Sequence, residues 1–396
     1  MHASDHATFE MMRDADIATI ARVMAHAFAG TRESSAQWLT AAGLEHMRVM
    51  RTPDGTTPAC LLRIPMAQYF GGRSVPMVGI AGVGVAPEAR GRGHAAAMMR
   101  ACVQSLHDEG VALSGLYCST QALYRRVGYE QAGLRYQIRL PISRISVPGK
   151  ARNVRPLEKA DEPLIRACYA AYAPRFDGAL DRGAYCWGRV ASFREVEHFP
   201  FGFFNEAGEL EGYVYLSQQR LPTGRHEVWL TDVVFLTPDA GRQILAFFAD
   251  FEPTADTIVF HGSPAHPLLS LLPQQRYSVE FKDVWMIRIT HLDRALATRG
   301  YNPGVRTSVT LNVHDDAICG HEGSWMLRVE GGRAIVARGA EGPVLDCTIS
   351  GLAAMYSGLF TPTQARMLGW CSGGDEAMHA AGAIFHGSMP WMIDQF

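Results

Sequence analysis

Hydrophobic residues in the first third of the chain recur at two spacings, one typical of helices and one typical of strands. Ile17, Ile20, Val23 and Met24 lie three or four positions apart and predict a helix over 14–28. A second apolar stripe with this spacing predicts a helix from Ala95 to about Asp108. The remaining pattern predicts a short helix over 121–127 and strands over 47–51, 59–65, 75–85, 111–117 and 129–142. Mixed elements of this kind indicate an α+β fold.

The order of elements repeats in outline after the turn-forming residues Pro148-Gly149-Lys150. We expect helices over 164–172 and 242–251 and strands over 213–216, 227–237 and 258–261. The chain therefore divides into a first domain over 1–148 and a second, similar domain over 149–288. In the last part, alternating residues predict strands over 309–313, 325–329 and 334–337, followed by helices over 350–359 and 362–368. This order suggests a small α+β domain over 289–396.

Composition narrows the class of protein. The 396 residues carry 37 basic and 39 acidic side chains, and a net charge of −2 gives no general attraction to nucleic acid or to an anionic membrane. The eight cysteines contain no C-x-x-C pair, so we expect reduced thiols, no structural metal site and no disulfide framework. The first residues lack the basic and apolar regions of a signal peptide, and no long apolar run follows. A cytoplasmic enzyme or binding protein is the expectation.

The segment from Val83 to His94 is the strongest chemical signal. A strand that ends near Val85 is followed by Arg90-Gly91-Arg92-Gly93 and then by an Ala-rich helix. Free N–H groups at a helix N-terminus attract anions, glycines let a phosphate approach the main chain, and arginines add charged hydrogen bonds. We interpret this segment as a pyrophosphate cradle. The alternative is a Gly-rich surface turn with solvated arginines. A Rossmann site is disfavoured because no G-x-G-x-x-G opens a helix, and no P-loop motif occurs.

The cradle resembles the Arg/Gln-x-x-Gly-x-Gly/Ala signature of the GNAT N-acetyltransferases. The three-part chain, together with Ser119-Thr-Gln-Ala-Leu-Tyr-Arg-Arg-Val-Gly-Tyr129 and an aromatic last residue, resembles the Eis-like branch of that superfamily. The resemblance implies tandem GNAT folds followed by a sterol-carrier-like domain. The second unit has Val233-Val-Phe-Leu-Thr-Pro but no Arg-x-x-Gly-x-Ala, so we expect it to be degenerate and non-catalytic. The resemblance also implies acetyl-CoA as the donor, contacted by Val83, Val85, Arg90, Gly91, Arg92, Gly93, His94, Ala95 and Ser119.

Two residues are candidates for proton transfer. Tyr124 follows the strand that ends at Tyr117, and a phenol can protonate a departing thiolate; its alternative role is core packing. The tail Trp391-Met-Ile-Asp-Gln-Phe396 is unusually apolar, so we expect it to dock on the protein. In the Eis-like family the tyrosine at this place is the general acid and the terminal carboxylate is the base. The resemblance carries these roles to Tyr124 and Phe396. The alternative for Phe396 is a hydrophobic anchor.

The acceptor is the least determined part. Phe28 and Trp38 are plausible pocket aromatics, and ordinary core packing is the alternative for each. Where known members carry pocket acids, this chain has Gly30 and Gln395, which Asp394 or Glu33 could compensate. An aminoglycoside-like amine, a polyamine and a lysine amine all stay open as acceptors. The resemblance further implies a homo-oligomer, often a hexamer. The competing hypothesis is a non-enzymatic CoA- or lipid-binding protein that uses the sterol-carrier-like domain.

Overall fold

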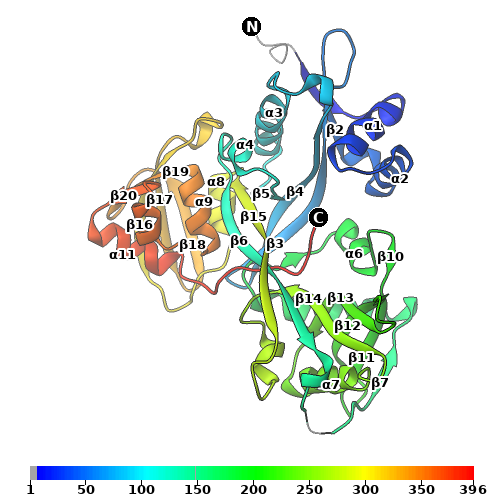
Figure 1. Cartoon of the computed structure of the whole chain (residues 1–396). Coiled ribbons are helices and arrows are strands. Elements are labelled where there is room, and N and C mark those ends of the chain that lie inside the picture. Colours follow the sequence, from blue (N-terminus) through cyan, green and yellow to red (C-terminus); the bar gives the residue numbers. More distant parts are fainter. Residues whose placement is uncertain (1–6, 148) are drawn as a thin grey trace.

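The computed structural model describes residues 7–147 and 149–396, which form three units (Figure 1). The predicted boundary residue Pro148 and the N-terminal residues 1–6 lie outside the described residues. The first unit is drawn in blue to cyan, the second mainly in green, and the third in orange to red. The last residues of the third unit return as a red coil to the middle of the molecule, between the first two units.

The first unit follows the predicted order of strands and helices, with one helix that the sequence did not reveal, α2. Its elements are β1 (Thr8–Met11), α1 (Ile17–Ala27), α2 (Arg32–Ala42), β2 (Met47–Arg51), β3 (Ala59–Phe70), β4 (Arg73–Val85), α3 (His94–Asp108), β5 (Leu113–Tyr117), α4 (Gln121–Arg125) and β6 (Glu130–Pro141). The side chain of Thr31 caps α2 by accepting a hydrogen bond from the Ser34 N–H, which fixes the start of this helix.

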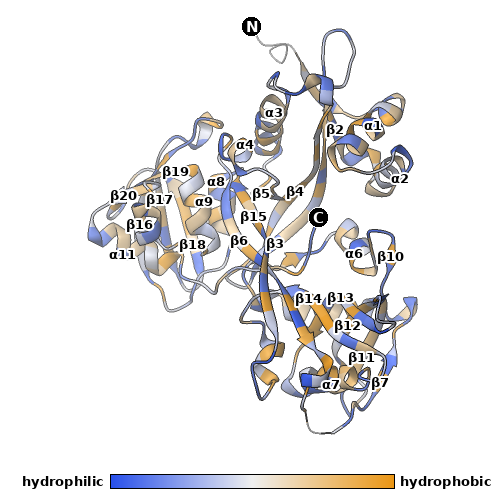
Figure 2. Ribbon diagram, viewed as in Figure 1, coloured by the Kyte–Doolittle hydropathy of each residue, from blue (hydrophilic) through white to orange (hydrophobic). Residues whose placement is uncertain are grey.

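The described part of the second unit contains three α-helices and nine strands, several of them very short. They are β7 (Val154–Pro156), α5 (Glu162–Tyr172), β8 (Leu180–Asp181), α6 (Ala184–Ala191), β9 (Ser192–Phe193), β10 (Val196–Glu197), β11 (Phe199–Phe204), β12 (Leu210–Arg220), β13 (His226–Phe235), α7 (Pro238–Ala249), β14 (Ala255–Gly262) and β15 (Ser278–Ile289). Figure 2 shows apolar residues along β13 and β14 and more hydrophilic colour on the outer loops. These two strands supply part of the core of the second unit.

The third unit has a five-stranded sheet in the order β18-β17-β16-β19-β20, together with helices α8 to α11. Its elements are α8 (Leu292–Thr298), β16 (Thr307–His314), β17 (Gly323–Glu330), β18 (Arg333–Arg338), β19 (Val344–Thr348), α9 (Ile349–Ser357), α10 (Pro362–Met367), β20 (Cys371–Gly373) and α11 (Asp375–Ile384). The three predicted strands and both predicted helices are present, and α8, β19, β20 and α11 are additions.

One sheet runs through the first two units. Its strand order is β1-β2-β3-β4-β5-β15-β6-β14-β13-β12-β11-β7, and β8 pairs with β3. Strand β15 is thus inserted between β5 and β6, and β6 continues on to pair with β14. Because each unit completes its sheet with a strand from the other, the two units are fixed in one orientation.

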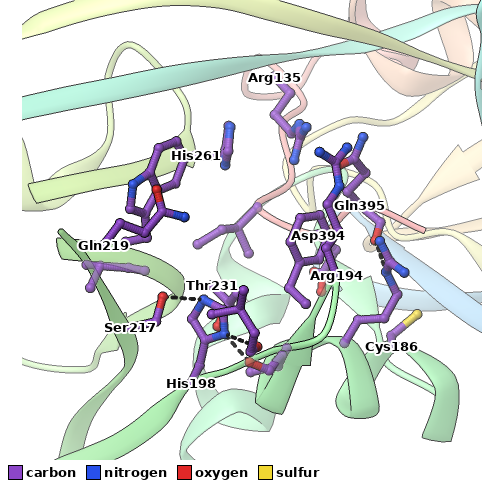
Figure 3. A pocket seen from close by; sticks show the side chains of 17 residues that line it. Arg135, Cys186, Arg194, His198, Ser217, Gln219, Thr231, His261, Asp394 and Gln395 are labelled. Atoms are coloured by element: carbon purple, nitrogen blue, oxygen red, sulfur yellow. Dashed lines mark hydrogen bonds between the residues drawn. The ribbon is translucent and has the colours of Figure 1, made fainter. Parts of the chain in front are cut away.

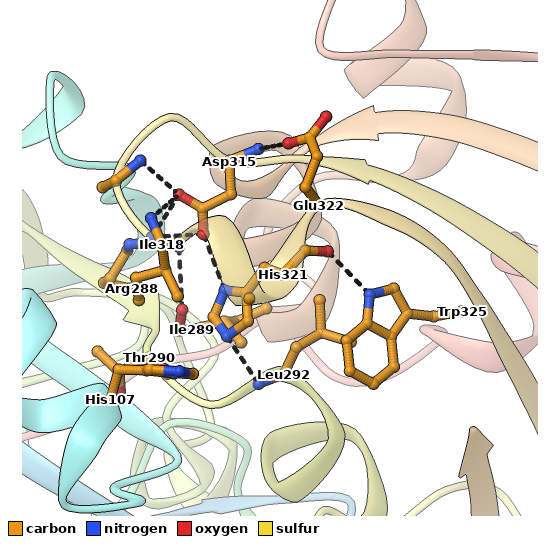
Figure 4. A network of polar contacts seen from close by, with 12 residues as sticks. His107, Arg288, Ile289, Thr290, Leu292, Asp315, Ile318, His321, Glu322 and Trp325 are labelled. Atoms are coloured by element: carbon orange, nitrogen blue, oxygen red, sulfur yellow. Dashed lines mark hydrogen bonds and ion pairs between the residues drawn. The ribbon is translucent and has the colours of Figure 1, made fainter. Parts of the chain in front are cut away.

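A buried ion pair attaches the third unit to this sheet (Figure 4). Arg288 of β15 and Asp315, which follows β16, are both fully buried and meet at 2.6 and 2.7 Å. Asp315 also accepts from His321 Nδ1 at 2.8 Å, while His321 Nε2 accepts from the Leu292 N–H at 3.3 Å. Although burial acts to raise it, these bonds hold the pKa of Asp315 at about 2. Removing either charge would leave the other buried without a partner, so the contact fixes how the third unit sits on β15.

Candidate functional site

The site begins where two parallel strands of the first unit part. Strands β4 and β5 pair from Met77 opposite Leu113 to Ile80 opposite Leu116, but β4 continues to Val85. A β-bulge lies in this free stretch, since Gly82 and Val83 together oppose a single residue of β3. Gly82 has a φ of +58°, a conformation that glycine adopts without strain. The bulge and the parting of the strands leave an edge of β4 main chain that a ligand can pair with.

The predicted cradle follows this edge as an exposed loop. Gly91 and Gly93 have φ values of +75° and +86°, and a side chain added at Gly91 would meet no atom within 4 Å. Helix α3 starts at His94, and no side chain caps it. The Ala97 N–H is bonded to the Gly93 carbonyl, so the three preceding N–H groups point out of the helix end. The loop therefore presents free donors in open space, as an anionic group requires.

Two further observations fit a diphosphate at this loop. Arg90 and Arg92 are exposed, and neither forms an ion pair within the described residues. His94 is 4% exposed, and its Nδ1 is buried without a hydrogen-bond partner among the described residues. A buried polar atom without a partner is costly, and a ligand that donates or accepts a hydrogen bond there would remove the cost.

Tyr124, the candidate general acid, belongs to the apolar cluster that reaches the end of β4. It is in α4, is 5% exposed, and packs in the same apolar cluster as Val83, Val85 and Cys118. Burial, with a smaller contribution from Cys118, raises the pKa of its phenol to about 12. The phenol is therefore protonated at neutral pH. Ser119 is exposed at the end of β5, one turn of chain before α4.

The C-terminal segment reaches β4 and β5 from the other side. The Phe396 ring packs edge-to-face on Tyr117 at 5.6 Å, and a side chain at Gly79 of β4 would lie 2.8 Å from Phe396 Cε2. The Tyr117 hydroxyl donates to the Asp394 carbonyl at 2.7 Å, and Arg189 Nε donates to the Gln395 carbonyl at 2.8 Å. Phe396 is thus held where β4 and β5 separate, next to the edge described above.

A buried ionic network anchors this segment. Arg182, with a side chain 0% exposed, contacts Asp394 at 2.8 Å and Asp232 at 2.5 and 3.1 Å. The Tyr213 hydroxyl also donates to Asp232 at 2.8 Å. Burial raises the pKa of Asp394, although Arg182 opposes the shift. Asp394, predicted to contact the acceptor, uses one oxygen to anchor the tail; its other oxygen, Oδ2, is buried without a partner in the described structure.

Two cavities lie between the first and second units. The smaller, of about 220 Å³, is lined by residues from β6, α6, β13, β14 and the tail, among them Arg135, Trp229, His261 and Asp394 (Figure 3). The larger, of about 830 Å³, lies between α2 and α6. Trp38 lines the larger cavity and donates from Nε1 to the Tyr185 hydroxyl at 3.2 Å. Phe28 is 57% exposed at the end of α1 and lines neither cavity.

Sequence reasoning did not find the arginines around these cavities. Arg189 and Arg194, which line both cavities, belong to no motif, and only the unusual density of aromatic and basic residues over 185–194 could have singled them out. Arg182 of the buried network lies outside that stretch and has no such signal. The described residues hold no group of three His, Cys, Asp or Glu side chains arranged for a metal ion. Among the same residues, none of the helices combines the length and the apolar character needed to span a bilayer.

Comparison with protein families matches all three units. An acetyltransferase (GNAT) domain model matches residues 8–132, a second acetyltransferase (GNAT) domain model matches residues 178–289, and a sterol carrier protein domain model matches residues 292–393. The fold predicted from the sequence, two GNAT units and a sterol-carrier-like unit, is confirmed.

Individual relatives agree with this assignment. A GCN5-related N-acetyltransferase structure from Anabaena variabilis is 31% identical, with a TM-score of 0.94 over 99% of this chain and 100% of that one. An uncharacterized N-acetyltransferase from Streptomyces avermitilis is 27% identical over 84% of this chain and 85% of its own. N-acetyltransferase Eis of Mycobacterium tuberculosis is 26% identical over 76% of this chain and 77% of its own.

Proposed function

Because the chain belongs to the Eis-like branch of the GCN5-related N-acetyltransferases, we propose that it transfers the acetyl group of acetyl-CoA directly to a primary amine. Acetyl transfer to amines in general is the activity of this family. The proposal adds which residues of this chain bind the donor, which one acts as the general acid and which one acts as the general base. The observation that carries it is the placement of three groups around β4: the free α3 N-terminus follows this strand, Tyr124 shares an apolar cluster with Val83 and Val85, and Phe396 packs at Gly79.

The donor side of the site is the β4 edge and the cradle. Val83 and Val85 offer main-chain groups where β4 has left β5, and Arg90 to Ala95 offer N–H donors and two guanidinium groups for the diphosphate. Ser119 borders the end of β5. The bound donor supplies a thioester that an amine can attack, and the role of these residues is to hold its acyl carbon in place.

Tyr124 supplies the proton that the departing sulfur takes up. The thioester C–S bond breaks as the new C–N bond forms, and the phenol gives its proton to the sulfur as negative charge develops there. Its raised pKa lowers its acid strength, but the same burial keeps the proton on the oxygen at every physiological pH. A thiol leaves, and the phenolate is reprotonated between turnovers.

The α-carboxylate of Phe396 accepts the proton that the amine loses. The tail is fixed by Tyr117, Arg182 and Arg189, so this carboxylate has a defined position beside β4. A fixed base next to the acyl carbon removes the entropy cost of recruiting one from solvent. Trp38 lines the larger cavity, from which an amine can approach. The alternative of a non-enzymatic lipid-binding protein is not supported, since the chain is a GNAT-type N-acetyltransferase.

The test is release of free thiol from acetyl-CoA with a panel of primary amines, measured on the wild type and on a variant extended by two residues beyond Phe396. We expect the extension to reduce kcat by about 100-fold or more, while the Kd for CoA stays the same. An extended enzyme with full activity would remove Phe396 from the mechanism. An enzyme that binds CoA but releases no thiol with any amine would refute the proposed function as a whole.

A further inference from the structure

Two arginines converge on one ring between the cavities. The guanidinium carbons of Arg189 and Arg194 lie 4.7 and 5.3 Å from the centroid of the Phe193 ring. Both arginines line the smaller cavity and the larger one, so they stand where the two meet. Arg194 holds this position with a φ of +52° in the tight turn between β9 and β10. The two guanidinium groups carry like charges beside one ring, and an anion bound to both would offset their repulsion.

Within the described residues, neither arginine is neutralised by a carboxylate. Arg189 uses its Nε on the Gln395 carbonyl and forms no ion pair, and Arg194 has no hydrogen bond or ion pair. Asp394 is the acidic residue of the smaller cavity, and Arg182 already binds it. The acids of the larger cavity are Glu45, which contacts His46, and Glu195, which forms no ion pair. The paired guanidinium groups therefore keep a local excess of positive charge.

Apart from Asp394, the described residues that line the smaller cavity include no acidic side chain. Arg135 of β6 lines it, although Asp283 pairs with this arginine at 2.6 Å. Burial, and then the charges of Arg135, Lys282 and Arg194, lower the pKa of His261 to about 3, so this histidine is neutral. Figure 3 shows Arg135, Arg194 and Gln395 together on one side of the cavity, with Ser217 and Gln219 on the other. Apolar surface from Phe193, Val190 and Trp229 completes the lining.

We propose that Arg189 and Arg194 form a carboxylate subsite of the acceptor pocket, so that the preferred acceptor is an amine joined to a carboxylate through an apolar spacer. This inference rests on the proposed function. The planar guanidinium fork matches a carboxylate with two parallel hydrogen bonds, and the apolar wall accommodates the spacer. Arg189 also holds Gln395, next to Phe396, which places the carboxylate subsite one residue from the proposed base. A polycationic acceptor would instead bring its second ammonium group against two arginines.

The experiment uses three amines with the same six-carbon chain: ε-aminocaproate, hexylamine and hexamethylenediamine. With the wild type, kcat/KM for ε-aminocaproate should exceed that for hexylamine by roughly 10-fold, and the diamine should be poorest. Arg194→Asn removes the charge and suits the left-handed turn. It should raise KM for ε-aminocaproate about fivefold and leave hexylamine unchanged. Arg306→Asn, at an arginine 83% exposed in the third unit, is the matched control and should change neither.

Calorimetric titration of the same amines into the CoA-bound enzyme gives a second measurement that needs no turnover. Tighter binding of ε-aminocaproate than of hexylamine, weakened by Arg194→Asn, supports the subsite. Equal or better binding and turnover of hexylamine or the diamine overturns it while leaving acetyl transfer intact. Thiol release with none of the amines, together with selective binding of ε-aminocaproate, would instead contradict the proposed function and keep the anion site.

Discussion

The first and second units carry the same strand and helix arrangement, but their helix N-termini differ. In each unit two parallel strands pair and then part: β4 and β5 after Ile80, β13 and β14 after Trp229. In the first unit α3 begins with a left-handed glycine and no side-chain cap. In the second, Thr237 accepts a hydrogen bond from the Ala240 N–H at 3.2 Å and caps α7. The second helix satisfies its own donors, whereas the first leaves them for a ligand.

The gap between the strands also differs. In the second unit it is filled by the C-terminal segment of the chain itself. Trp391 packs on Phe176 and His266 at 5.2 Å, and Asp394 joins Asp232 of β13 through Arg182. A cavity of only about 10 Å³ remains there. Under the proposed function, one fold then serves two purposes: the gap of the first unit receives the donor, and the gap of the second holds the tail that reaches the first.

The largest expected effect is a loss of kcat in a tyrosine variant of the first unit that a tyrosine variant of the second unit does not show. Tyr124→Phe should lower kcat by roughly 100- to 10,000-fold without weakening CoA binding, because it removes only the proton donor. Tyr172→Phe in α5 is the matched control, since the Tyr172 hydroxyl is buried without a partner in the described structure and its loss should leave kcat unchanged. Steady-state kinetics with CoA titration checks both. Comparable losses of activity in the two variants would mean that Tyr124 acts only through packing.

The pH profile provides an independent check on Tyr124. The acceptor amine must be neutral, so kcat/KM should rise with pH as the amine loses its proton. Burial raises the pKa of Tyr124 to about 12, so the acid form persists and the rate should not fall between pH 8 and about pH 10. A phenol with an ordinary pKa near 10 would lose its proton within that window and produce a descending limb. Such a limb in the wild type would contradict the assignment.

The next effect tests whether the second unit holds the tail. Arg182→Met leaves Asp232 and Asp394 buried without their cation, and should reduce the free energy of unfolding by about 3–5 kcal/mol. It should also lower kcat, because Phe396 loses its fixed position. Denaturant unfolding and kinetics measure the two effects. Adding Asp394→Asn to Arg182→Met should recover part of the stability but not the activity. Full activity in a folded Arg182→Met protein would show that the tail does not need this anchor.

The sequence predicts much of this comparison and misses the rest for physical reasons. The glycine and arginine spacing at Arg90–Gly93 predicts the uncapped helix start, and the absence of this spacing after Val233 predicts a second unit without a cradle, because both are local signals. The insertion of β15 between β5 and β6 depends on pairing between distant strands, which no local pattern encodes. The Arg182 network likewise joins residues 50 and 212 positions apart. Phe28 has the same aromatic character as Trp38, yet of the two only Trp38 lines one of the two cavities between the first and second units.

A smaller effect is expected on the Kd for CoA when the arginines near the start of α3 are replaced, compared with an arginine near the start of α7. Replacing Arg90 and Arg92 together with Gln should raise the Kd for CoA about 10-fold, since two exposed charge-assisted bonds to the diphosphate are lost. Arg242→Gln, at an exposed position in α7, should leave that Kd unchanged. Raising the salt concentration should reduce the difference between wild type and the double variant. If the variant at Arg242 weakens CoA binding as much, the donor does not lie at α3.

The smallest expected effect tests whether the α7 cap or the tail prevents CoA from binding to the second unit. Thr237→Ala removes the α7 cap and should cost about 1 kcal/mol of stability, with unchanged kinetics. Thr361→Ala, which removes the corresponding cap of α10 in the third unit, is the control for the cost of losing a cap. Calorimetry should still find one CoA per chain in Thr237→Ala, because the tail continues to fill the gap between β13 and β14. A second CoA bound to that variant would show that the cap alone, rather than the tail, keeps the donor out.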